Sequence, residues 1–372
     1  MKVVGIMSGT SLDGVDYVLC QDRSAKSKNT KSSSSKLGQP LKYLDQHFIP
    51  FKKDLRDALL KATANELSLW DTARLHYELG AFYAEGLKKI VKNKKWKFDL
   101  IGLHGQTVFH QPPHSTLQIG EPSFLKQEFK VPVVAQFRNM DIAQKGQGAP
   151  LAPFFHKALM TPYKDWAFQN IGGMGNVTYV NQKKLCAFDT GPGNILMDET
   201  MTHLYQKTFD KDGAIAHKGL PHVELVEDWL KAIPYFSKPV PKTCGRENMS
   251  LKVLEKSLEG LRKLSPEDQM ATLMEFTVLS LKDQYRRFIK TPPQLIVVSG
   301  GGAKNKRLMQ RMVFHFPQSR VTTSDELLGW PVDAIEGGAF AWLALKRYRN
   351  EAISDLPTVT GAKTAVTLGV IC

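Results

Sequence analysis

The sequence predicts an α/β protein made of two domains of similar design. Its 372 residues exceed what one ordinary hydrophobic core holds. Short apolar runs typical of buried strands alternate with segments of helical periodicity. Residues 3–18 and 166–180 share one pattern, a strand followed by a glycine turn and a second strand, although they share almost no identity. Such a weak repeat indicates an internal duplication.

The composition is that of a soluble protein, with 42% hydrophobic and 23% charged residues. The sequence has no apolar stretch of the roughly 20 residues that a membrane span needs, and it enters a strand without a signal segment. The four cysteines, at positions 20, 186, 244 and 372, lie far apart and lack metal-binding spacing. We therefore expect a cytoplasmic location and no membrane partner.

The net charge of +14 raises the question of nucleic-acid binding. The lysines are spread along the chain, and the one dense cluster, at 23–36, has no interleaved aromatic residues to stack on bases. We favour a basic enzyme that handles anionic ligands and expect no nucleic-acid partner. The Lys- and Ser-rich insertion at 23–40 should be a flexible surface loop, with docking to an acidic partner as the alternative.

The first half of the chain reads as strands and one long helical segment. Strands are expected at 3–7, from Val15, and at 41–51, and residues 54–93 read as helix. Leu75, Leu79, Phe82, Gly86 and Ile90 form its apolar stripe. Further strands at 98–103, 116–122 and 131–137 each end in polar residues, which mark the ligand edge of an α/β sheet. A metal site at His104, His110 and His114 is disfavoured by their irregular spacing.

The second half repeats this organisation. Residues 187–195 place Asp189 at a strand end, followed by a Gly-Pro-Gly turn and Asn194 as the cap of a helix reaching Gln206. Ser265 and Pro266 should start a helix through Arg287. Residues 294–305 read as a strand, a triple-glycine turn and a new helix. Gly337 and Gly338, each costing about 1 kcal/mol inside the last helix, indicate that this helix packs closely against a neighbour. We expect domains at 1–135 and 136–372.

The turns at 8–14, 188–194 and 298–303 resemble the phosphate-1, phosphate-2 and adenosine motifs of the actin-like (RNase H-like) ATPase fold. Nearly the whole chain resembles the anhydro-N-acetylmuramic acid kinase family, through residues 7–16, 102–108, 118–123, 146–153, 170–173, 188–194 and 333–341. Departures from the family pattern are the insertion at 23–36, Gly175, Gly337-Gly338, Thr243-Cys244 and Met249. They leave the substrate pocket and the helix packing open.

The resemblance implies a phosphotransferase of cell-wall recycling with a nucleotide and substrate cleft between two domains. Such an enzyme opens the 1,6-anhydro ring of anhydro-N-acetylmuramic acid with water and phosphorylates O6 from ATP with Mg²⁺. The products are N-acetylmuramic acid 6-phosphate and ADP. The implied partner is this small molecule, and a homodimer is compatible with the sequence. The rivals are a kinase of another anhydrosugar such as levoglucosan and a partner-driven actin-like ATPase.

The resemblance also implies roles for individual residues. Asp189 is the expected base, with capping of its turn as the alternative. Glu336 is expected to orient the sugar or the water, or else to be a first-turn acid favoured by the helix dipole. Arg138 suits the lactyl carboxylate, or else a surface pair with Asp141.

The expected nucleotide-binding residues are Gly9, Thr10, Ser11, Leu12, Asp13, Gly14, Val15, Asp16, Gly172, Gly173, Asn176, Gly191, Gly193, Asn194, Gly300, Gly301, Gly302 and Asn305. Asp13 and Asp16 are expected near Mg²⁺, through water. The expected substrate-binding residues are His104, Gln106, Thr107, Glu121, Arg138 and Asp141.

Overall fold

A computed structural model describes residues 1–9, 11–23, 38–181 and 184–372, and for residues 184, 246 and 247 it describes the backbone only. Thr10 and most of the basic insertion therefore lie outside the described residues. The chain divides into two compact units. Unit 1 comprises Met1–Pro162 and Asp333–Cys372, and unit 2 comprises Tyr163–Val332. This division differs from the expected boundary at residue 135, because the chain returns to unit 1 after residue 332.

Unit 1 is built on a six-stranded sheet of order β13-β7-β4-β1-β2-β3. The bounds are β1 Lys2–Met7, β2 Gly14–Asp22, β3 Leu41–Pro50, β4 Leu100–Leu103, β7 Val133–Ala135 and β13 Val370–Ile371. Strands β1, β2 and β3 pair antiparallel, whereas β4 and β7 continue the sheet in parallel from β1. Strands β5 (Gln106–Gln111) and β6 (Ser115–Ile119) form a separate hairpin.

The helices of unit 1 are α1 (Lys53–Thr63), α2 (Leu69–Lys94), α3 (Ser123–Phe129), α4 (Asn139–Ala143), α5 (Ala152–Leu159), α13 (Ala334–Tyr348) and α14 (Leu356–Val359). The single helix expected over 54–93 is thus wrong, since Ser68 caps a second helix by accepting a hydrogen bond from the backbone N–H of Asp71. The predicted stripe is largely confirmed, because Leu75, Leu79, Gly86 and Ile90 are buried.

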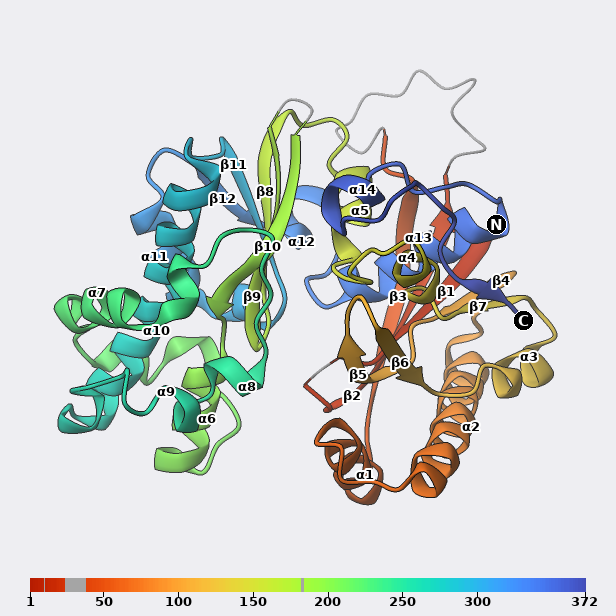
Figure 1. The fold of residues 1–372 in the computed structure, drawn as a ribbon, viewed down its shortest axis with the longest axis horizontal. Helices are drawn as coiled ribbons and strands as arrows, with labels where there is room; N and C mark the ends of the chain where they lie inside the picture. Colours follow the sequence, from red (N-terminus) through yellow and green to blue (C-terminus); the bar gives the residue numbers. More distant parts are fainter. Residues whose placement is uncertain (10, 24–37, 182–183) are drawn as a thin grey trace. The chain divides into compact units, whose positions relative to one another are not determined.

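Helix α13 packs against the sheet of unit 1 at very short range (Figure 1). In the figure this blue helix lies beside the red strands at the other end of the colour scale. A Cβ atom built on Gly5 would lie 1.8 Å from the carbonyl oxygen of Gly337, and one built on Gly337 would lie 2.4 Å from Val18 Cγ2. The close packing predicted from the helical glycines is therefore confirmed for Gly337.

Unit 2 has a five-stranded sheet of order β10-β9-β8-β11-β12. The bounds are β8 Asp165–Ile171, β9 Met174–Asn181, β10 Lys184–Pro192, β11 Leu295–Ser299 and β12 Arg320–Thr323. Strands β8, β9 and β10 pair antiparallel, and β11 and β12 follow in parallel from β8. This order matches β3-β2-β1-β4-β7 of unit 1, so the predicted duplication is confirmed in topology, with the actin-like arrangement in each unit.

The main helices of unit 2 are α6 (Ile195–Tyr205), α7 (Val223–Ala232), α8 (Arg246–Met249), α9 (Leu251–Leu254), α10 (Pro266–Gln284), α11 (Lys306–His315) and α12 (Ser324–Leu328). Unit 2 also contains a 3₁₀ turn, η4 (Pro234–Ser237), and a π-helical turn, η6 (Tyr285–Ile289). Ser265 caps α10 through the N–H of Asp268, as predicted. Among the described residues, the helices include none long and apolar enough to cross a membrane.

Candidate active site

The opening turn of unit 1 connects β1 to β2. Its backbone closes with the N–H of Leu12 donating to the carbonyl of Gly9 at 3.3 Å, and Ser11 Oγ donates to Asp13 Oδ1 at 2.6 Å. The side chain of Gln106 reaches the same turn, where Nε2 donates to the Gly9 carbonyl at 3.2 Å. Two groups of predicted site residues, one from each strand end, are thus brought together at the edge of this sheet.

The residues of this turn differ in what they offer a ligand. Asp13 and Ser11 are exposed and Asp16 is half-buried. Leu12 and Val15 are buried in the core, with 4% and 0% of their area exposed, so only their backbone is available to a nucleotide. A Cβ atom on Gly14 would lie 2.4 Å from the carbonyl oxygen of Ile49. Among the described residues of this turn, the hydroxyl of Ser11 and the carboxylates of Asp13 and Asp16 are therefore the side-chain groups that it can offer to a ligand.

Arg138 is held by two contacts on the loops of unit 1. Nη1 donates to the carbonyl of Gly148 at 2.7 Å, and Nη2 lies 2.9 Å from Nε2 of His104. Because a guanidinium can only donate, the ring nitrogen must accept, which requires a neutral His104 with its proton on Nδ1. Burial lowers the pKa of His104 well below its usual range, and the charge of Arg138 lowers it further. His104 thus orients Arg138 as a neutral acceptor.

Arg138 and Glu336 act on each other electrostatically. Glu336 lies in the first turn of α13 and is exposed by area. Burial of its carboxyl group among protein atoms nevertheless raises the pKa of Glu336, with Asp13 adding to the rise and Arg138 opposing it. Burial lowers the pKa of Arg138 to about 10, against the effects of Glu336 and Asp141. The guanidinium therefore stays charged at neutral pH and faces an acid.

Asp141 lies inside unit 1, with 0% of its area exposed. Its Oδ2 accepts from the N–H of Gly148 at 2.6 Å and its Oδ1 from Thr360 Oγ1 at 2.6 Å. Asp141 fixes the loop whose Gly148 carbonyl holds Arg138. The alternative of a surface pair between Arg138 and Asp141 is therefore wrong, because Asp141 is buried, and a substrate contact of Asp141 stays a prediction.

Glu121 and Thr107 are engaged within unit 1. Glu121 Oε2 lies 3.1 Å from His76 Nε2 on α2, and Oε1 accepts from the N–H of Ser123 at 2.9 Å, at the start of α3. Thr107 Oγ1 accepts from Gln118 Nε2 at 3.3 Å across the β5–β6 hairpin. These contacts explain why both residue types occur there, and a role for either in substrate binding stays a prediction.

In unit 2, the glycine turns expected to bind phosphate meet at one end of the sheet. The N–H groups of Gly193 and Asn194 donate to the carbonyls of Gly173 and Gly172, at 2.9 and 2.8 Å. A Cβ atom on Gly193 would lie 2.3 Å from the Gly172 carbonyl oxygen, so glycine is required there. The side chain of Asn194 donates to the carbonyl of Ile171 at 3.2 Å instead of capping α6, which corrects the predicted cap.

The triple-glycine turn after β11 joins the same end of unit 2. A Cβ atom on Gly300, whose φ is +78°, would lie 2.4 Å from Asn170 Oδ1, and one on Gly302 would lie 2.4 Å from Ile171 Cγ2. Asn305 Oδ1 accepts from the N–H of Leu308 at 3.0 Å and so caps α11. The three glycine turns of unit 2 thus form one cradle of backbone groups, which suits the phosphates of a nucleotide.

Asp189 lies on β10 opposite Asn176, where the strand register shifts between Asp189 and Gly191. Oδ2 of Asp189 accepts from the N–H of Cys244 at 2.8 Å, and its backbone carbonyl accepts from the Tyr235 hydroxyl at 2.6 Å. Burial raises the pKa of Asp189 to about 6, against the lowering effect of the Cys244 N–H. A half-buried carboxylate of this kind, ionised at neutral pH and unusually basic, suits a general base.

Sequence reasoning missed Tyr235 and the backbone of Cys244. The only signal was the departure at Thr243-Cys244 from the pattern of the resembled family. For Mg²⁺, the described residues contain no group of three or more His, Cys, Asp or Glu side chains suited to a metal. Mg²⁺ at nucleotide sites usually takes one or two carboxylates with water and phosphate oxygens. The exposed Asp13 and the half-buried Asp16 fit that donor set.

The chain matches known proteins over its full length. The model of the anhydro-N-acetylmuramic acid kinase family matches residues 1–372. An anhydro-N-acetylmuramic acid kinase of Microcystis aeruginosa is 37% identical over 100% of both chains, and one of Pasteurella multocida is 35% identical over 100% of this chain and 96% of that one. A solved dehydratase activator from Clostridium difficile with bound ADPNP covers 94% of this chain at 10% identity, with a TM-score of 0.47, too low to bear on function. The chain belongs to the anhydro-N-acetylmuramic acid kinase family.

Proposed function

We propose that this protein converts anhydro-N-acetylmuramic acid, ATP and water into N-acetylmuramic acid 6-phosphate and ADP. The single observation that carries the mechanism is Asp189, a half-buried carboxylate whose pKa is raised to about 6 by burial, beside a cradle of glycine turns. Family membership supports the substrate, because the relatives matched over their full length are named for it. The reaction belongs to cell-wall recycling, and we expect it in the cytoplasm.

Asp189 would act on water. Cleavage of the 1,6-anhydro bond at the anomeric carbon needs a nucleophile there, and a carboxylate that accepts one proton makes water competent. At pH 7 a group of pKa about 6 is mostly ionised, and it is a stronger base than an ordinary Asp. The bridging oxygen leaves the anomeric carbon as the O6 alkoxide and forms its new bond to the γ-phosphorus of ATP, from which ADP departs.

The glycine turns and the acids of the opening turn would serve the phosphoryl transfer. The glycines of the turns would let phosphate oxygens approach the backbone without a side chain in the way, while the N–H groups of Gly193 and Asn194 keep the turns together. Asp13 and Asp16 would hold a hydrated Mg²⁺, which when bound neutralises charge on the β- and γ-phosphates. Thr10 is proposed from the sequence alone, since it lies outside the described residues.

Arg138 and Glu336 would recognise the sugar. A fixed guanidinium matches the lactyl carboxylate of the substrate with two parallel hydrogen bonds. Glu336, whose pKa is raised by burial, would accept a hydrogen bond from a sugar hydroxyl or from the attacking water. An uncharged anhydrosugar such as levoglucosan gives Arg138 no carboxylate to bind, which favours the acidic sugar. A homodimer stays a prediction.

The test is mass spectrometry of the product formed from ATP, Mg²⁺ and anhydro-N-acetylmuramic acid in ¹⁸O-labelled water. Wild-type protein should give a phosphorylated sugar with the label at C1, and Asp189→Asn should lose roughly 10²- to 10⁴-fold in kcat. Asp165→Asn, in the same unit at the start of β8, is the matched control. Unlabelled phosphorylated product would refute water attack at C1. Labelled product formed by Asp189→Asn at the wild-type rate would refute the role of Asp189.

A further inference from the structure

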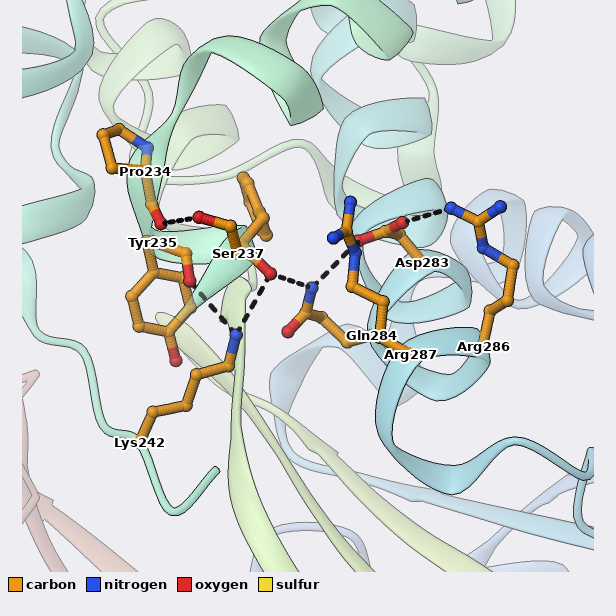
Figure 2. A network of polar contacts seen from close by, with 9 residues as sticks. Pro234, Tyr235, Ser237, Lys242, Asp283, Gln284, Arg286 and Arg287 are labelled. Atoms are coloured by element: carbon orange, nitrogen blue, oxygen red, sulfur yellow. Dashed lines mark hydrogen bonds and ion pairs between the residues drawn. The ribbon is translucent and has the colours of Figure 1, made fainter. Parts of the chain in front are cut away.

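Lys242 is a buried lysine outside the residues discussed so far. Only 7% of its area is exposed, in contrast to Lys238 on the same segment, which is exposed. Figure 2 shows its side chain directed at the turn that carries Tyr235. Nζ donates to the backbone carbonyl of Tyr235 at 3.1 Å and lies 4.5 Å from the centre of the Tyr235 ring. Burying an ammonium group destabilises the folded protein unless hydrogen bonds and cation–π contacts compensate for the lost water. The burial of Lys242 therefore indicates a specific role.

The contacts of Lys242 close a ring with Asp189. The Lys242 ammonium donates to the Tyr235 carbonyl, the Tyr235 hydroxyl donates to the Asp189 carbonyl at 2.6 Å, and the Asp189 N–H donates to the Lys242 carbonyl at 3.0 Å. Two residues beyond Lys242, the N–H of Cys244 donates to the Asp189 carboxylate. The backbone of Asp189 and its carboxylate are therefore both held by one segment, residues 235–244.

The turn itself is anchored from its other side. The Phe236 carbonyl accepts from Gln284 Nε2 at 3.1 Å. Figure 2 shows how the contacts continue from Gln284 to Asp283 and Arg287. Lys242 Nζ lies 3.5 Å from this same carbonyl. The Phe236 carbonyl keeps its Gln284 donor without the ammonium, so loss of Lys242 should be felt at Tyr235 and passed to Asp189.

We propose that Lys242 and Tyr235 are positioning residues that hold the Asp189 carboxylate against the Cys244 N–H and in place to accept a proton from the attacking water. This rests on the proposed function, in which Asp189 is the base. The strand register of β10 shifts just after Asp189, between Asp189 and Gly191, so the regular pairing that holds Asp189 opposite Asn176 is interrupted directly beyond it. The ring of hydrogen bonds supplies the positional restraint that the strand does not give beyond that point. Misplacement of a reacting group by about 1 Å costs roughly 100-fold in rate.

The charge on Lys242 gives the ring a pH signature. Burial lowers the pKa of Lys242 to about 8. The charged and titratable groups that face it are Cys244, Arg287, Asp283 and Lys238. Above that pH the neutral amine donates more weakly to the Tyr235 carbonyl, and its cation–π attraction to the aromatic ring of Tyr235 is lost. The wild-type kcat should therefore fall as pH rises through about 8.

The experiment compares Lys242→Met and Tyr235→Phe with Lys238→Met, a control that removes a nearby exposed lysine. We expect both ring variants to lose roughly 10- to 100-fold in kcat while the KM values for sugar and ATP change less than about threefold. Loss of the Cys244 hydrogen bond raises the pKa of Asp189, so the acid limb of kcat should move above pH 6. The alkaline limb should vanish in Lys242→Met, and also in Tyr235→Phe, which cuts the path from the ammonium to Asp189. It should persist in Lys238→Met with a small upward shift, because a neighbouring positive charge is removed.

Asp189→Asn, assayed in parallel for ¹⁸O incorporation, separates the two proposals. If Asp189→Asn is inactive while both ring variants keep the wild-type kcat and pH limbs, the positioning role is overturned and the proposed function stands. If Asp189→Asn forms labelled product at the wild-type rate, the role of Asp189 as the base fails, and the positioning role of Lys242 and Tyr235 fails with it. Far-ultraviolet circular dichroism checks that each variant folds. If Lys242→Met does not fold, Tyr235→Phe alone decides the question, because it removes one hydroxyl and keeps the aromatic side chain.

Discussion

The two units share one strand order but hold their acids in different ways. In unit 1, Glu336 at the start of α13 faces the guanidinium of Arg138. In unit 2, Asp189 at a strand irregularity is held by the N–H of Cys244, and its pKa is raised by burial to about 6. Burial raises the pKa of both acids, but the group that opposes this rise is a guanidinium in unit 1 and a backbone N–H in unit 2.

The cores of the two units differ in a similar way. Unit 1 joins its sheet to α13 through the contact of Gly5 with Gly337. Unit 2 joins α10 to α11 through Glu275, 1% exposed, which accepts hydrogen bonds at 2.7 Å from Nε and Nη2 of Arg311 and also contacts His315. The packing of unit 1 thus depends on glycines, which have no side chain, whereas that of unit 2 depends on the buried carboxylate of Glu275, whose charge is paired with Arg311.

Gly5→Ala should have the largest effect on stability. The added methyl group would meet the Gly337 carbonyl at 1.8 Å, a backbone group that cannot move without shifting α13, so we expect a loss of about 3 kcal/mol or more. Urea unfolding would measure it. Gly173→Ala in unit 2 is the matched control, because its Cβ would meet nothing within 4 Å. Equal midpoints for the two variants would contradict the close contact.

Glu275→Gln should cost about 3 kcal/mol, since it leaves Arg311 without its charge partner. Burial alone would raise the pKa of Glu275, but hydrogen bonds from His315 and Arg311 lower it to about 2. A lowered pKa means stability that is present above the unfolded value near 4.5 and is lost as pH falls toward 2. The urea midpoints of wild type and variant should therefore differ at pH 7 and converge near pH 2. A difference independent of pH would contradict this.

Arg138→Lys should raise the KM for the sugar roughly 10- to 100-fold and leave the KM for ATP unchanged. Lysine keeps the charge but loses the planar pair of donors and the fixed contact with His104. Steady-state kinetics with each substrate varied in turn would show it. A change in the KM for ATP instead would place Arg138 with the nucleotide and break the contrast between the charged region of unit 1 and the glycine cradle of unit 2.

Asp189→Asn should lose activity and yet stabilise the protein by about 1 to 2 kcal/mol at pH 7. A carboxyl whose pKa is raised from 3.8 to about 6 destabilises the folded state once pH exceeds both values, and Asn carries no such charge. The gain should shrink as pH falls through 6 and vanish below about 4. Thermal unfolding across this pH range tests the prediction. An unchanged or lower melting temperature at pH 7 would show that the ionised Asp189 carboxylate does not destabilise the folded protein.

Local patterns in the sequence predicted most strands, the glycine turns and the Ser265 cap, because apolar periodicity and capping depend on near neighbours. The domain boundary was wrong because α13 follows all of unit 2 in sequence and packs on β1 through Gly5. The side chain of Asn194 was misassigned for the same kind of reason, since its partner, the Ile171 carbonyl, comes from another strand.

The candidate site was predicted in its acids and glycines but not in its supports. Asp189 and Arg138 were proposed from the sequence because their residue types and strand-end positions point to chemistry, and their roles stay predictions. Tyr235 and Lys242 each share a hydrogen bond with Asp189, which lies more than 40 positions away in the sequence. Lys242 also donates to a backbone carbonyl, that of Tyr235. Contacts of these kinds produce no periodic pattern in a sequence. Asp141 has the same residue type as Asp189, and only its burial separates an anchor from a reactive group.

Unit 1 is discontinuous, and this has a consequence for biosynthesis. Unit 2, residues 163–332, is contiguous and can fold as soon as it leaves the ribosome, whereas the sheet of unit 1 waits for α13 to cover it. Until then the apolar face of β1 and the backbone at Gly5 stay open to other nascent chains. Translation thus delivers all of unit 2 before α13 of unit 1 has been made.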